Sequence, residues 1–367
     1  MALFSRRPLS PIGIDIGTRC IKAAQLELSE ERNRVVALAQ HLLPVDSASP
    51  AERTEAVRSG IAAVLRMGQF KGRDVVLSLN AQQLFVQNVR VPRLPDDELT
   101  KVVRWEAEER LPEDFGESEI RHLVAGDIRT PTNTGEGTEA RREVVVLACR
   151  RKEIQEMIQM LETLSLRPVA IDVSACALVR TSHAMMRRRA DEQAAFLFID
   201  IGAGMTTVVV TRGHEILLIK SLAVGGLSMD RLVARKLKLN LEDAALARQQ
   251  SGNATGEAID PDLARVVADS VRGELESLAG ELLMCIRYHS VTFRGNRITK
   301  AVLFGGESCP QLADQLSGCI DIPCESGDPF QGLDASPLVE EQLKASRRGQ
   351  WVVALGLCTK PARSVAA

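Results

Sequence analysis

The composition of the 367-residue chain is that of a soluble globular protein, with 45% hydrophobic and 26% charged residues and a formal net charge of −2. A chain of this length can bury a large core and has room for two domains. Because the net charge is close to zero and aromatic residues make up only 3%, nucleic acid is not expected as a partner.

Cysteine usage and apolar runs exclude further classes. The eight cysteines form no Cys-x-x-Cys pair and the five histidines are scattered, so neither a zinc site nor a disulfide framework is indicated. No apolar run approaches the ~20 residues that span a bilayer. Arg6 and Arg7 are not followed by the apolar segment that a secretory signal needs. We therefore expect a cytoplasmic protein.

The first predicted element is a β-hairpin. After a loose arm at residues 1–11, Ile12-Gly-Ile-Asp-Ile-Gly17 alternates apolar and polar residues and then reaches glycine, which predicts a half-buried strand entering a tight turn. A second strand resumes after the turn. Asp15 lies just before the turn, and Thr18 and Lys22 follow it with a hydroxyl and a cation suited to phosphate oxygens.

The next elements predict a mixed α/β layer that gives way to an inserted block. A helix over 50–67 and a buried strand at 74–79 follow the hairpin. From residue 83 to about 165 the order becomes strand, helix, strand, strand, helix, with a polar loop at 130–140. The first helix of this block carries an apolar stripe at helical spacing, made of Leu99, Val102, Val103 and Ala107.

The second half opens with a copy of the first motif. A strand at 168–173 and a helix over 174–188 link the halves, and Phe198-Ile-Asp-Ile-Gly202 then repeats the alternation into glycine. Asp200 stands where Asp15 stands in the first copy. Further helices are predicted over 241–250, 261–293, 310–316 and 349–358.

Two such hairpins suit a nucleotide. Glycine lets backbone N–H groups approach an anion closely. An adjacent carboxylate can hold Mg²⁺, which bridges phosphate oxygens and keeps several of its waters. A single Asp-Ile-Gly would be an ordinary strand end. Two copies in the same context favour two loops that grip one nucleoside triphosphate from both sides.

Two glycine pairs later in the chain, Gly225-Gly226 and Gly305-Gly306, each stand between a strand and a helix. Such a position puts bare backbone beside a ligand or another helix. For Gly305-Gly306 alone, close helix packing is an equally good explanation.

These motifs resemble one superfamily. Asp15-x-Gly17-Thr18-x-x-x-Lys22, Asp200-x-Gly202-x-Gly204 and the two glycine pairs are similar to the phosphate and adenosine motifs of the actin, heat-shock chaperone and sugar-kinase ATPases. The inserted block is similar to that of FtsA and of the type IV pilus assembly PilM family. Three segments resemble PilM in particular, namely 102–108, 164–173, and 305–312 with 328–330. The resemblance covers nearly the whole chain.

The resemblance implies an actin-like two-lobed α/β ATPase fold, made of duplicated ribonuclease H-like domains with an FtsA/PilM-type inserted α+β subdomain. The implied division is an arm at 1–11, a first lobe at 12–82 and 166–190, the inserted subdomain at 83–165, a second lobe at 191–240 and 299–367, and a helical part of the second lobe at 241–298.

It also implies ATP and Mg²⁺ in the cleft between the lobes, with Asp15 and Asp200 on the metal side. The implied nucleotide-binding residues are Asp15, Gly17, Thr18, Arg19, Lys22, Asp200, Gly202, Ala203, Gly204, Met205, Thr206, Gly225, Gly226, Asp230, Arg248, Gly305, Gly306 and Glu307.

The sequence departs from the family pattern at four places. Arg19-Cys20 stands where small residues usually line the first loop, and Glu307 replaces a third glycine. Ala245 and Arg248 stand where an acidic residue and a lysine are usual. We expect these changes to weaken nucleotide binding without removing its core of Asp15, Thr18, Lys22 and Asp200.

The family further implies a scaffold of pilus assembly with slow hydrolysis at most, peripheral to the inner membrane through its partner. That partner is the cytoplasmic tail of a PilN-like membrane protein, which docks beside the inserted subdomain. The strand at 84–91 and a seam against the first lobe would receive an extended peptide. Self-association stays open.

Two other functions stay open on the residues. A sugar or acetate kinase of the same superfamily needs a carboxylate base near the acceptor hydroxyl, for which Asp172 is the best candidate. Capping of the following helix explains Asp172 equally well. A scaffold without nucleotide is the third alternative, and the intact Asp15 and Asp200 loops argue against it.

Overall fold

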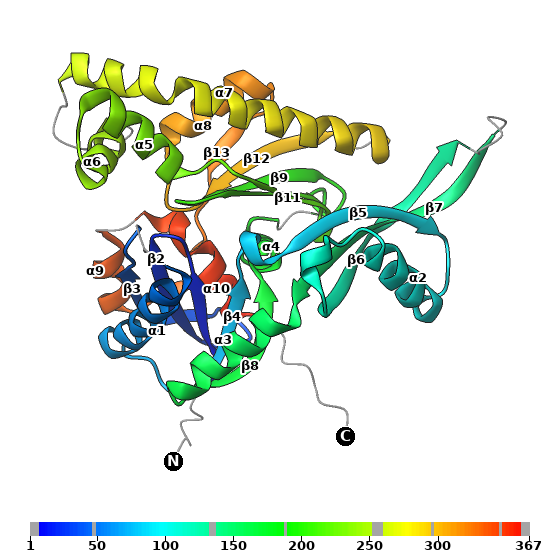
Figure 1. Cartoon of the computed structure of the whole chain (residues 1–367), viewed down its shortest axis with the longest axis horizontal. Helices are drawn as coiled ribbons and strands as arrows, with labels where there is room; N and C mark the ends of the chain where they lie inside the picture. Colours follow the sequence, from blue (N-terminus) through cyan, green and yellow to red (C-terminus); the bar gives the residue numbers. More distant parts are fainter. Residues whose placement is uncertain are drawn as a thin grey trace.

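The structure is a computed structural model that describes residues 7–45, 49–131, 137–186, 189–251, 260–294, 297–344 and 347–360 (Figure 1). Parts of the expected arm at 1–11, of the loop at 130–140 and of the link before residue 190 lie outside these residues. The loop is shorter than expected, because strands reach Pro131 on one side and begin at Thr138 on the other.

Two sheets with the same strand order form the two lobes. The first has the order β14-β3-β2-β1-β4-β8 and the second β11-β10-β9-β12-β13. In each, the central strand, β1 or β9, pairs antiparallel with the strand after its glycine turn and parallel with a later strand. The strands are β1 (Ile12–Ile16), β2 (Cys20–Glu27), β3 (Arg34–Leu42), β4 (Asp74–Leu79), β8 (Arg167–Val173) and β14 (Asp334–Ala335) in the first sheet, and β9 (Ala195–Ile201), β10 (Thr206–Arg212), β11 (Glu215–Leu222), β12 (Ile298–Phe304) and β13 (Cys324–Ser326) in the second.

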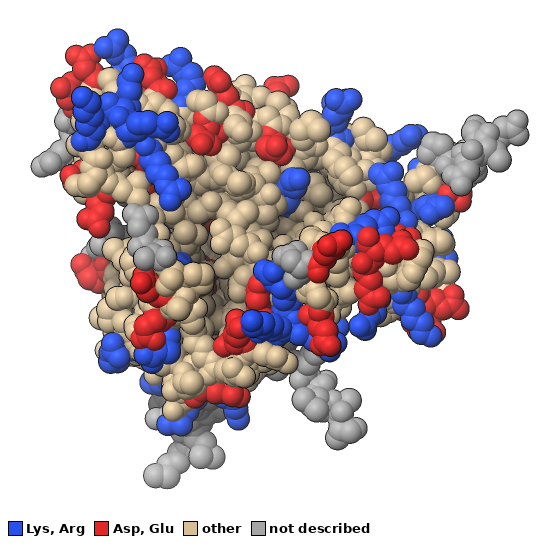
Figure 2. Space-filling view, viewed as in Figure 1, with Lys and Arg blue, Asp and Glu red and all other residues tan. Residues whose placement is uncertain are grey.

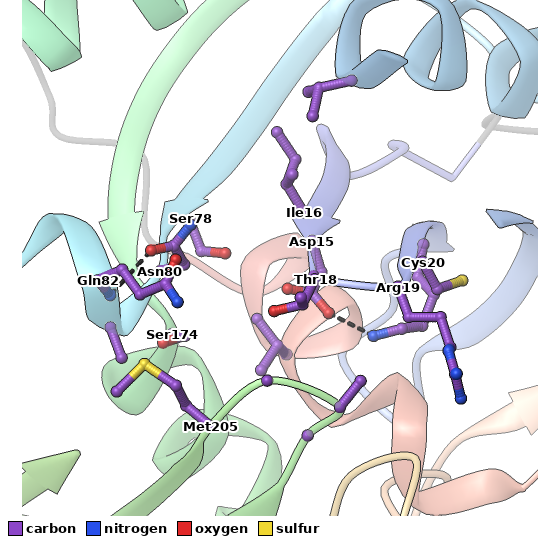
Figure 3. Close-up of a pocket in the computed structure, with 18 of the residues that line it drawn as sticks. Asp15, Ile16, Thr18, Arg19, Cys20, Ser78, Asn80, Gln82, Ser174 and Met205 are labelled. Atoms are coloured by element: carbon purple, nitrogen blue, oxygen red, sulfur yellow. Dashed lines mark hydrogen bonds and ion pairs between the residues drawn. The ribbon is translucent and has the colours of Figure 1, made fainter. Parts of the chain in front are cut away.

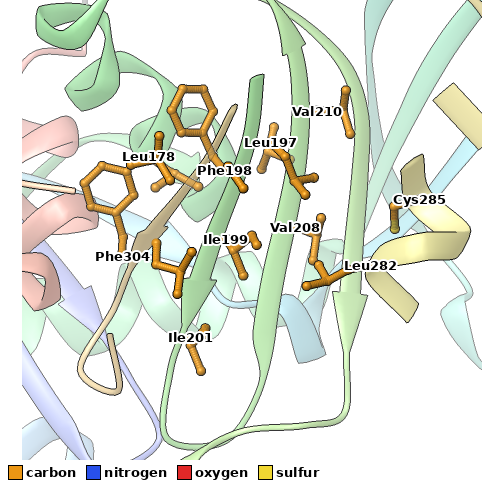
Figure 4. Close-up of a cluster of buried hydrophobic side chains, with 14 of the residues drawn as sticks. Leu178, Leu197, Phe198, Ile199, Ile201, Val208, Val210, Leu282, Cys285 and Phe304 are labelled. Carbon is orange, nitrogen blue, oxygen red and sulfur yellow. The ribbon is translucent and has the colours of Figure 1, made fainter. Parts of the chain in front are cut away.

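Helices cover both sheets and meet in a shared core. Fully buried Phe198 and Phe304 of the second sheet lie in one cluster with Leu178 of α4, a helix that contacts strands of both sheets (Figure 4). Each such side chain contributes about 1.5–3 kcal/mol by leaving water. The helices are α1 (Pro50–Met67), α3 (Arg151–Thr163), α4 (Ser174–Ser182), α9 (Pro337–Lys344) and α10 (Val352–Cys358) beside the first sheet, and α5 (Gly226–Leu237), α6 (Leu241–Ser251), α7 (Pro261–Thr292) and α8 (Pro310–Ile320) beside the second. Two expected helices are shorter, since 3₁₀ turns replace the end of α4 and the start of α10.

The inserted block forms a three-stranded sheet, ordered β5-β7-β6, with α2 on one face (Figure 1). Val144 and Val146 face α2, whereas Val145 and Leu147 belong to the core of the second lobe. The sheet packs mainly on β11 of the second lobe, and the end of β7, at Cys149, joins the core of the first lobe. The sequence of a strand that is apolar on both faces does not indicate which neighbouring element covers which face. The elements are β5 (Phe85–Pro92), α2 (Asp96–Glu108), β6 (Ser118–Pro131) and β7 (Thr138–Arg150).

The helix that ends the inserted block, α3, lies on the first lobe. Its buried residues Met157 and Leu161 join the cluster of Ile12, Ile14 and Leu77. The expected boundary at 83–165 is therefore corrected for residues 151–165, because the inward face of α3 packs beside β8.

The end of the chain also returns to the first lobe. β14 extends the first sheet beside β3, and α10 packs on β1, β2 and α4. A Cβ on Gly13 would lie 2.3 Å from the Ala354 carbonyl oxygen, and one on Gly356 would lie 2.0 Å from that of Ala177. Bare backbone thus lets α10 sit against both elements. The expected placement of 299–367 in the second lobe is wrong for residues 334–358.

A candidate nucleotide site between the lobes

A cavity of about 850 Å³ lies between the lobes, and both glycine turns reach it (Figures 2 and 3). Asp15 and Thr18 line it from the first turn, and Asp200 and Gly204 from the second. A Cβ on Gly204 would lie only 2.3 Å from the Thr18 Oγ1. The two turns therefore face each other in contact, as the paired motifs predict, and glycine is required at position 204 for that approach.

Charged side chains hold the first turn. The register of β1 and β2 sets Asp15 opposite Lys22, and the Lys22 Nζ lies 2.6 Å from the Asp15 Oδ2. Burial disfavours the ammonium, but the neighbouring Asp15, Cys20 and Asp200 together outweigh burial and raise the pKa of Lys22. The first aspartate therefore has a cation of its own beside it.

Arg53 of α1 binds the backbone of this turn. Its guanidinium donates to the carbonyl oxygens of Gly17 at 3.0 Å, Thr18 at 2.8 Å and Pro44 at 3.2 Å. Burial lowers the pKa of Arg53. Because three carbonyl groups converge on one side chain, the turn is fixed in one conformation. Arg53 lies in an ordinary run of charged helix residues, so the sequence carried no signal of this role.

Backbone contacts hold the second turn. Gly202 N–H donates to the Met205 carbonyl at 3.0 Å, and the first amides of α5, on Gly226 and Leu227, donate to Gly202 and Ala203 at 3.0 and 2.7 Å. A Cβ on Gly225 would lie 2.6 Å from the Ala203 carbonyl oxygen. Gly225-Gly226 therefore packs the start of α5 onto the turn.

Asp200 has no ion-pair partner among the described residues. Its burial and the charge of Asp15 raise its pKa to about 6, against a smaller opposing effect of Lys22. Gly305 lies beside it with φ of +97°, and a Cβ there would be 2.7 Å from the Asp200 Oδ1. The second aspartate thus lies against glycine backbone, and the cation that acts on it, Lys22, is already paired with Asp15.

A chain of ion pairs crosses the cleft from the first turn. Arg19 Nη1 lies 3.0 Å from the Asp230 Oδ2, Arg248 Nε lies 2.7 Å from the Asp230 Oδ1, and Arg248 Nη2 lies 2.7 Å from the Glu307 Oε2. Asp230 is fully buried in α5. Thus the residues that depart from the family pattern, Arg19, Arg248 and Glu307, bind one another through Asp230.

Most of the expected site residues line the cavity, but five do not. Thr206 is buried and donates its hydroxyl to the Val224 carbonyl at 2.8 Å. Gly225, Gly226, Asp230 and Arg248 lie behind the second turn. Those that line the cavity are Asp15, Gly17, Thr18, Arg19, Lys22, Asp200, Gly202, Ala203, Gly204, Met205, Gly305, Gly306 and Glu307.

Sequence reasoning missed further polar residues on the cavity. Among them, Ser78 lies near the carboxyl end of β4, Asn80 and Ser174 follow the carboxyl ends of the parallel strands β4 and β8, and Gln249 comes from α6 (Figure 3). Ligands in open α/β sheets bind at that edge, so the strand ends carried a usable signal.

Asp172, the candidate kinase base, is not brought to the cavity. It is buried on β8, where it pairs with Arg180 of α4 and with Lys360 after α10, whose Nζ lies 2.7 Å away. Asp172 therefore neither caps the following helix nor lies where a catalytic base on the cavity would lie. It binds the end of the chain to the first lobe.

Comparison with solved structures identifies the architecture. The chain is similar to a protein in a "PilM-PilN type IV pilus biogenesis complex", with 24% identity and a TM-score of 0.75 over 96% of this chain and 98% of that one. It is also similar to the ethanolamine utilization protein EutJ from Carboxydothermus hydrogenoformans, with 13% identity and a TM-score of 0.52 over 96% and 89%. The expected actin-like two-lobed fold is confirmed.

Within the described residues, no helix combines the length and apolarity needed to cross a bilayer.

A family-level match covers almost the whole length. Residues 13–361 match the family described as type IV pilus assembly protein PilM. This span contains both glycine turns, the inserted sheet and the returning helix α10. The chain therefore belongs to the PilM family.

Proposed function

We propose that the chain binds ATP with Mg²⁺ between its lobes and acts as a cytoplasmic scaffold of pilus assembly that docks a PilN-like inner-membrane protein. One observation carries the nucleotide part: two glycine turns face each other across one cavity, with Thr18 against Gly204 and with Asp15, Lys22 and Asp200 beside them. Such turns offer backbone N–H groups, a hydroxyl and a cation to phosphate oxygens.

The donor set fits Mg²⁺. Asp15 and Asp200 are close enough for the charge of one to raise the pKa of the other, and a dication held by both would remove that repulsion. Among the described residues, no three or more His, Cys, Asp or Glu side chains are placed so that they could hold a metal ion by themselves. Phosphate oxygens and water would therefore complete the ligand set, as is usual for Mg²⁺, which neutralises phosphate charge when bound.

Hydrolysis should be slow at most. Asp172 is engaged by two cations away from the cavity. Glu153 and Glu156, the α3 carboxylates on the cavity, lie 2.7 Å from Arg150 and 3.8 Å from Lys152. ATP would then act as a ligand that stabilises the closed cleft by binding it better. The same engagement of Asp172 leaves the kinase alternative without support.

Isothermal titration calorimetry tests the nucleotide part. Wild type should bind ATP with Mg²⁺ and much less tightly in EDTA, and Asp200→Asn should lose about 30-fold in affinity, on the order of 2 kcal/mol for a charged contact. Asp74→Asn is the matched control, because it removes an exposed first-sheet carboxylate that pairs with Arg167. Equal affinity in wild type and Asp200→Asn would refute this part.

Part of the lining of the same cavity supports the docking part. Gln82 and Gln83, between β4 and β5 where the chain leaves the first lobe, and Met157 and Met160 of α3 belong to this lining. Flexible thioethers with a polar rim suit an extended peptide. The solved relative at a TM-score of 0.75 comes from a PilM–PilN complex, which gives the kind of partner.

A labelled peptide of the PilN-like cytoplasmic tail tests docking. Met160→Arg should weaken its binding at least about tenfold, or 1.4 kcal/mol. Met67→Arg, at an exposed methionine of α1, is the control. Removing residues 83–165 is not a clean alternative, because the inserted sheet supplies Val145 and Leu147 to the second-lobe core. Unchanged peptide affinity in a folded Met160→Arg chain would refute this site.

A further inference from the structure

The outer face of α7 exposes an unusual amount of apolar surface. This 32-residue helix lies across the second sheet and buries Leu278 and Leu282 against it (Figure 1). On the solvent side, Leu283 is 44% exposed, Met284 61% and Val291 63%. No other element in the described part of the chain exposes three large apolar side chains. Such a concentration on one helix indicates an interaction surface.

Two glycines lie on the same face. Apart from the adjacent residues and backbone of α7 itself, no described atom lies within 4 Å of a Cβ built on Gly273 or on Gly280. Each glycine costs about 1 kcal/mol relative to alanine inside a helix. Since no described part of this chain approaches them, their lack of side chains serves no packing within the described structure.

The apolar residues and the glycines are spaced alike. Gly273 and Gly280 are seven residues apart, as are Met284 and Val291, and seven residues are close to two helical turns. In an antiparallel pair of α7 helices that is symmetric about position 282, Met284 of each copy faces Gly280 of the other, and Val291 faces Gly273. Met284 and Val291 thus each meet a glycine of the other copy, whereas Leu283 lies opposite Glu281.

The charges of α7 favour the same antiparallel arrangement. The same pairing sets Arg287 of one copy opposite Ser277 of the other, one position from Glu276. Glu276 and Arg287 are exposed and form no ion pair within the described residues, whereas Asp269 nearby already pairs with Arg272. In a symmetric parallel pair, each residue would meet its own copy. In an antiparallel pair, Glu276 of each copy lies close to Arg287 of the other.

We propose that the outer face of α7 binds a second copy of the chain as an antiparallel, two-fold symmetric helix pair. No described residue of α7 lines the cavity between the lobes, so this contact is separate from it. One helix pair buries less than the roughly 1,200 Å² at the lower end of stable interfaces, so the dimer is transient.

Sedimentation velocity of the full chain over a concentration series tests the proposal. Wild type should show a reversible monomer–dimer equilibrium. Gly280→Leu fills the gap that receives Met284 and should weaken dimerisation about tenfold or more, or 1.4 kcal/mol. The variant should keep its fold, since leucine has the higher helix propensity. Leu246→Glu, at a 55% exposed leucine of α6, should leave the equilibrium unchanged.

A charge exchange tests the orientation. Glu276→Arg alone should weaken the dimer, and Glu276→Arg combined with Arg287→Glu should restore it, because both copies then exchange signs. A wild-type chain that stays monomeric at every concentration would overturn the proposal and leave this face to a different protein. Dimers that persist in Gly280→Leu, or a double variant no tighter than the single one, would also overturn it.

Discussion

The two glycine turns carry the same Ile-Asp-Ile-Gly motif, yet different forces hold them. In the first turn Arg53 binds the carbonyl oxygens and Lys22 neutralises Asp15. In the second, backbone hydrogen bonds to α5 hold the turn, and Asp200 has no ion-pair partner within the described residues. A repeated motif thus fixes backbone geometry without fixing charge. One turn has its counter-charge built in, and the other is where we propose that Mg²⁺ supplies it.

The largest effect should follow from removing the built-in cation. Lys22→Met leaves Asp15, whose side chain is only 13% exposed, without a partner and near Asp200, which should cost about 3 kcal/mol of folding free energy at pH 7. Urea denaturation measures this, with the exposed Lys236→Met as control. A loss no larger than that of the control would mean that the first turn does not depend on its charge pair.

The second turn should respond with the opposite sign. Asp200→Asn removes a carboxylate that is costly to ionise, so the nucleotide-free chain should gain about 2 kcal/mol of stability at pH 7 while it loses Mg²⁺-dependent ATP binding. A thermal melt of the metal-free chain gives the sign. A lower melting temperature than wild type would contradict the assignment of Asp200 as the unpaired member.

This gain should depend on pH. The folded-state pKa of Asp200, about 6, lies above the value of about 3.9 for an unfolded aspartate, so the folded chain binds more protons between these values. Asp200 therefore costs nothing below pH 4, and its cost grows as pH rises and is complete above pH 6. The stability difference between Asp200→Asn and wild type should open over that window. A constant difference from pH 4 to pH 7.5 would refute this.

A smaller effect should follow from releasing the backbone of the first turn. Arg53→Met removes charged donors from three carbonyl groups and should cost about 1–2 kcal/mol. Hydrogen exchange at residues 17–20 should accelerate, while exchange at 202–205 should not change. Arg58→Met, on the exposed side of the same helix, is the control. Equal acceleration of hydrogen exchange in both turns would show that Arg53 does not hold the first turn specifically.

The smallest effect should come from the ion pair between Arg19 and Asp230, which joins the two lobes. Arg19→Gln leaves Asp230 with Arg248, so stability should fall by less than about 1 kcal/mol. Small-angle X-ray scattering of the nucleotide-free chain should nevertheless show a larger radius of gyration, because Arg19 reaches across the cleft. An unchanged radius would show that this pair does not hold the lobes together.

Sequence patterns predicted those structural elements that local interactions determine. Alternation into Gly17 and Gly202 predicted both hairpins, and helical periodicity predicted α1, α2 and α7. The facing of the turns followed from the repeat, because two equivalent hairpins in a duplicated fold meet at one cleft.

Long-range partners were beyond such patterns. Nothing in the sequence around Arg53 distinguishes a side chain that binds a distant turn from one that faces solvent. The carboxylate of Asp172 suggested a base or a cap, and only the fold shows it between Arg180 and Lys360. The raised pKa of Asp200 likewise depends on burial and on Asp15, 185 positions earlier in the chain (200 − 15).

The return of α10 to the first sheet sets an order of events during synthesis. Cys358 donates its thiol to the carbonyl oxygen of Ala24, 334 residues earlier, and Trp351 and Leu355 cover Leu26 and Leu38. At about 5–20 residues per second, roughly 15–70 s pass between the two ends of this contact. The face of the first sheet that α10 covers therefore stays open on the ribosome while the second lobe is made. A chain interrupted before this helix would display that apolar face, which marks it as unfinished.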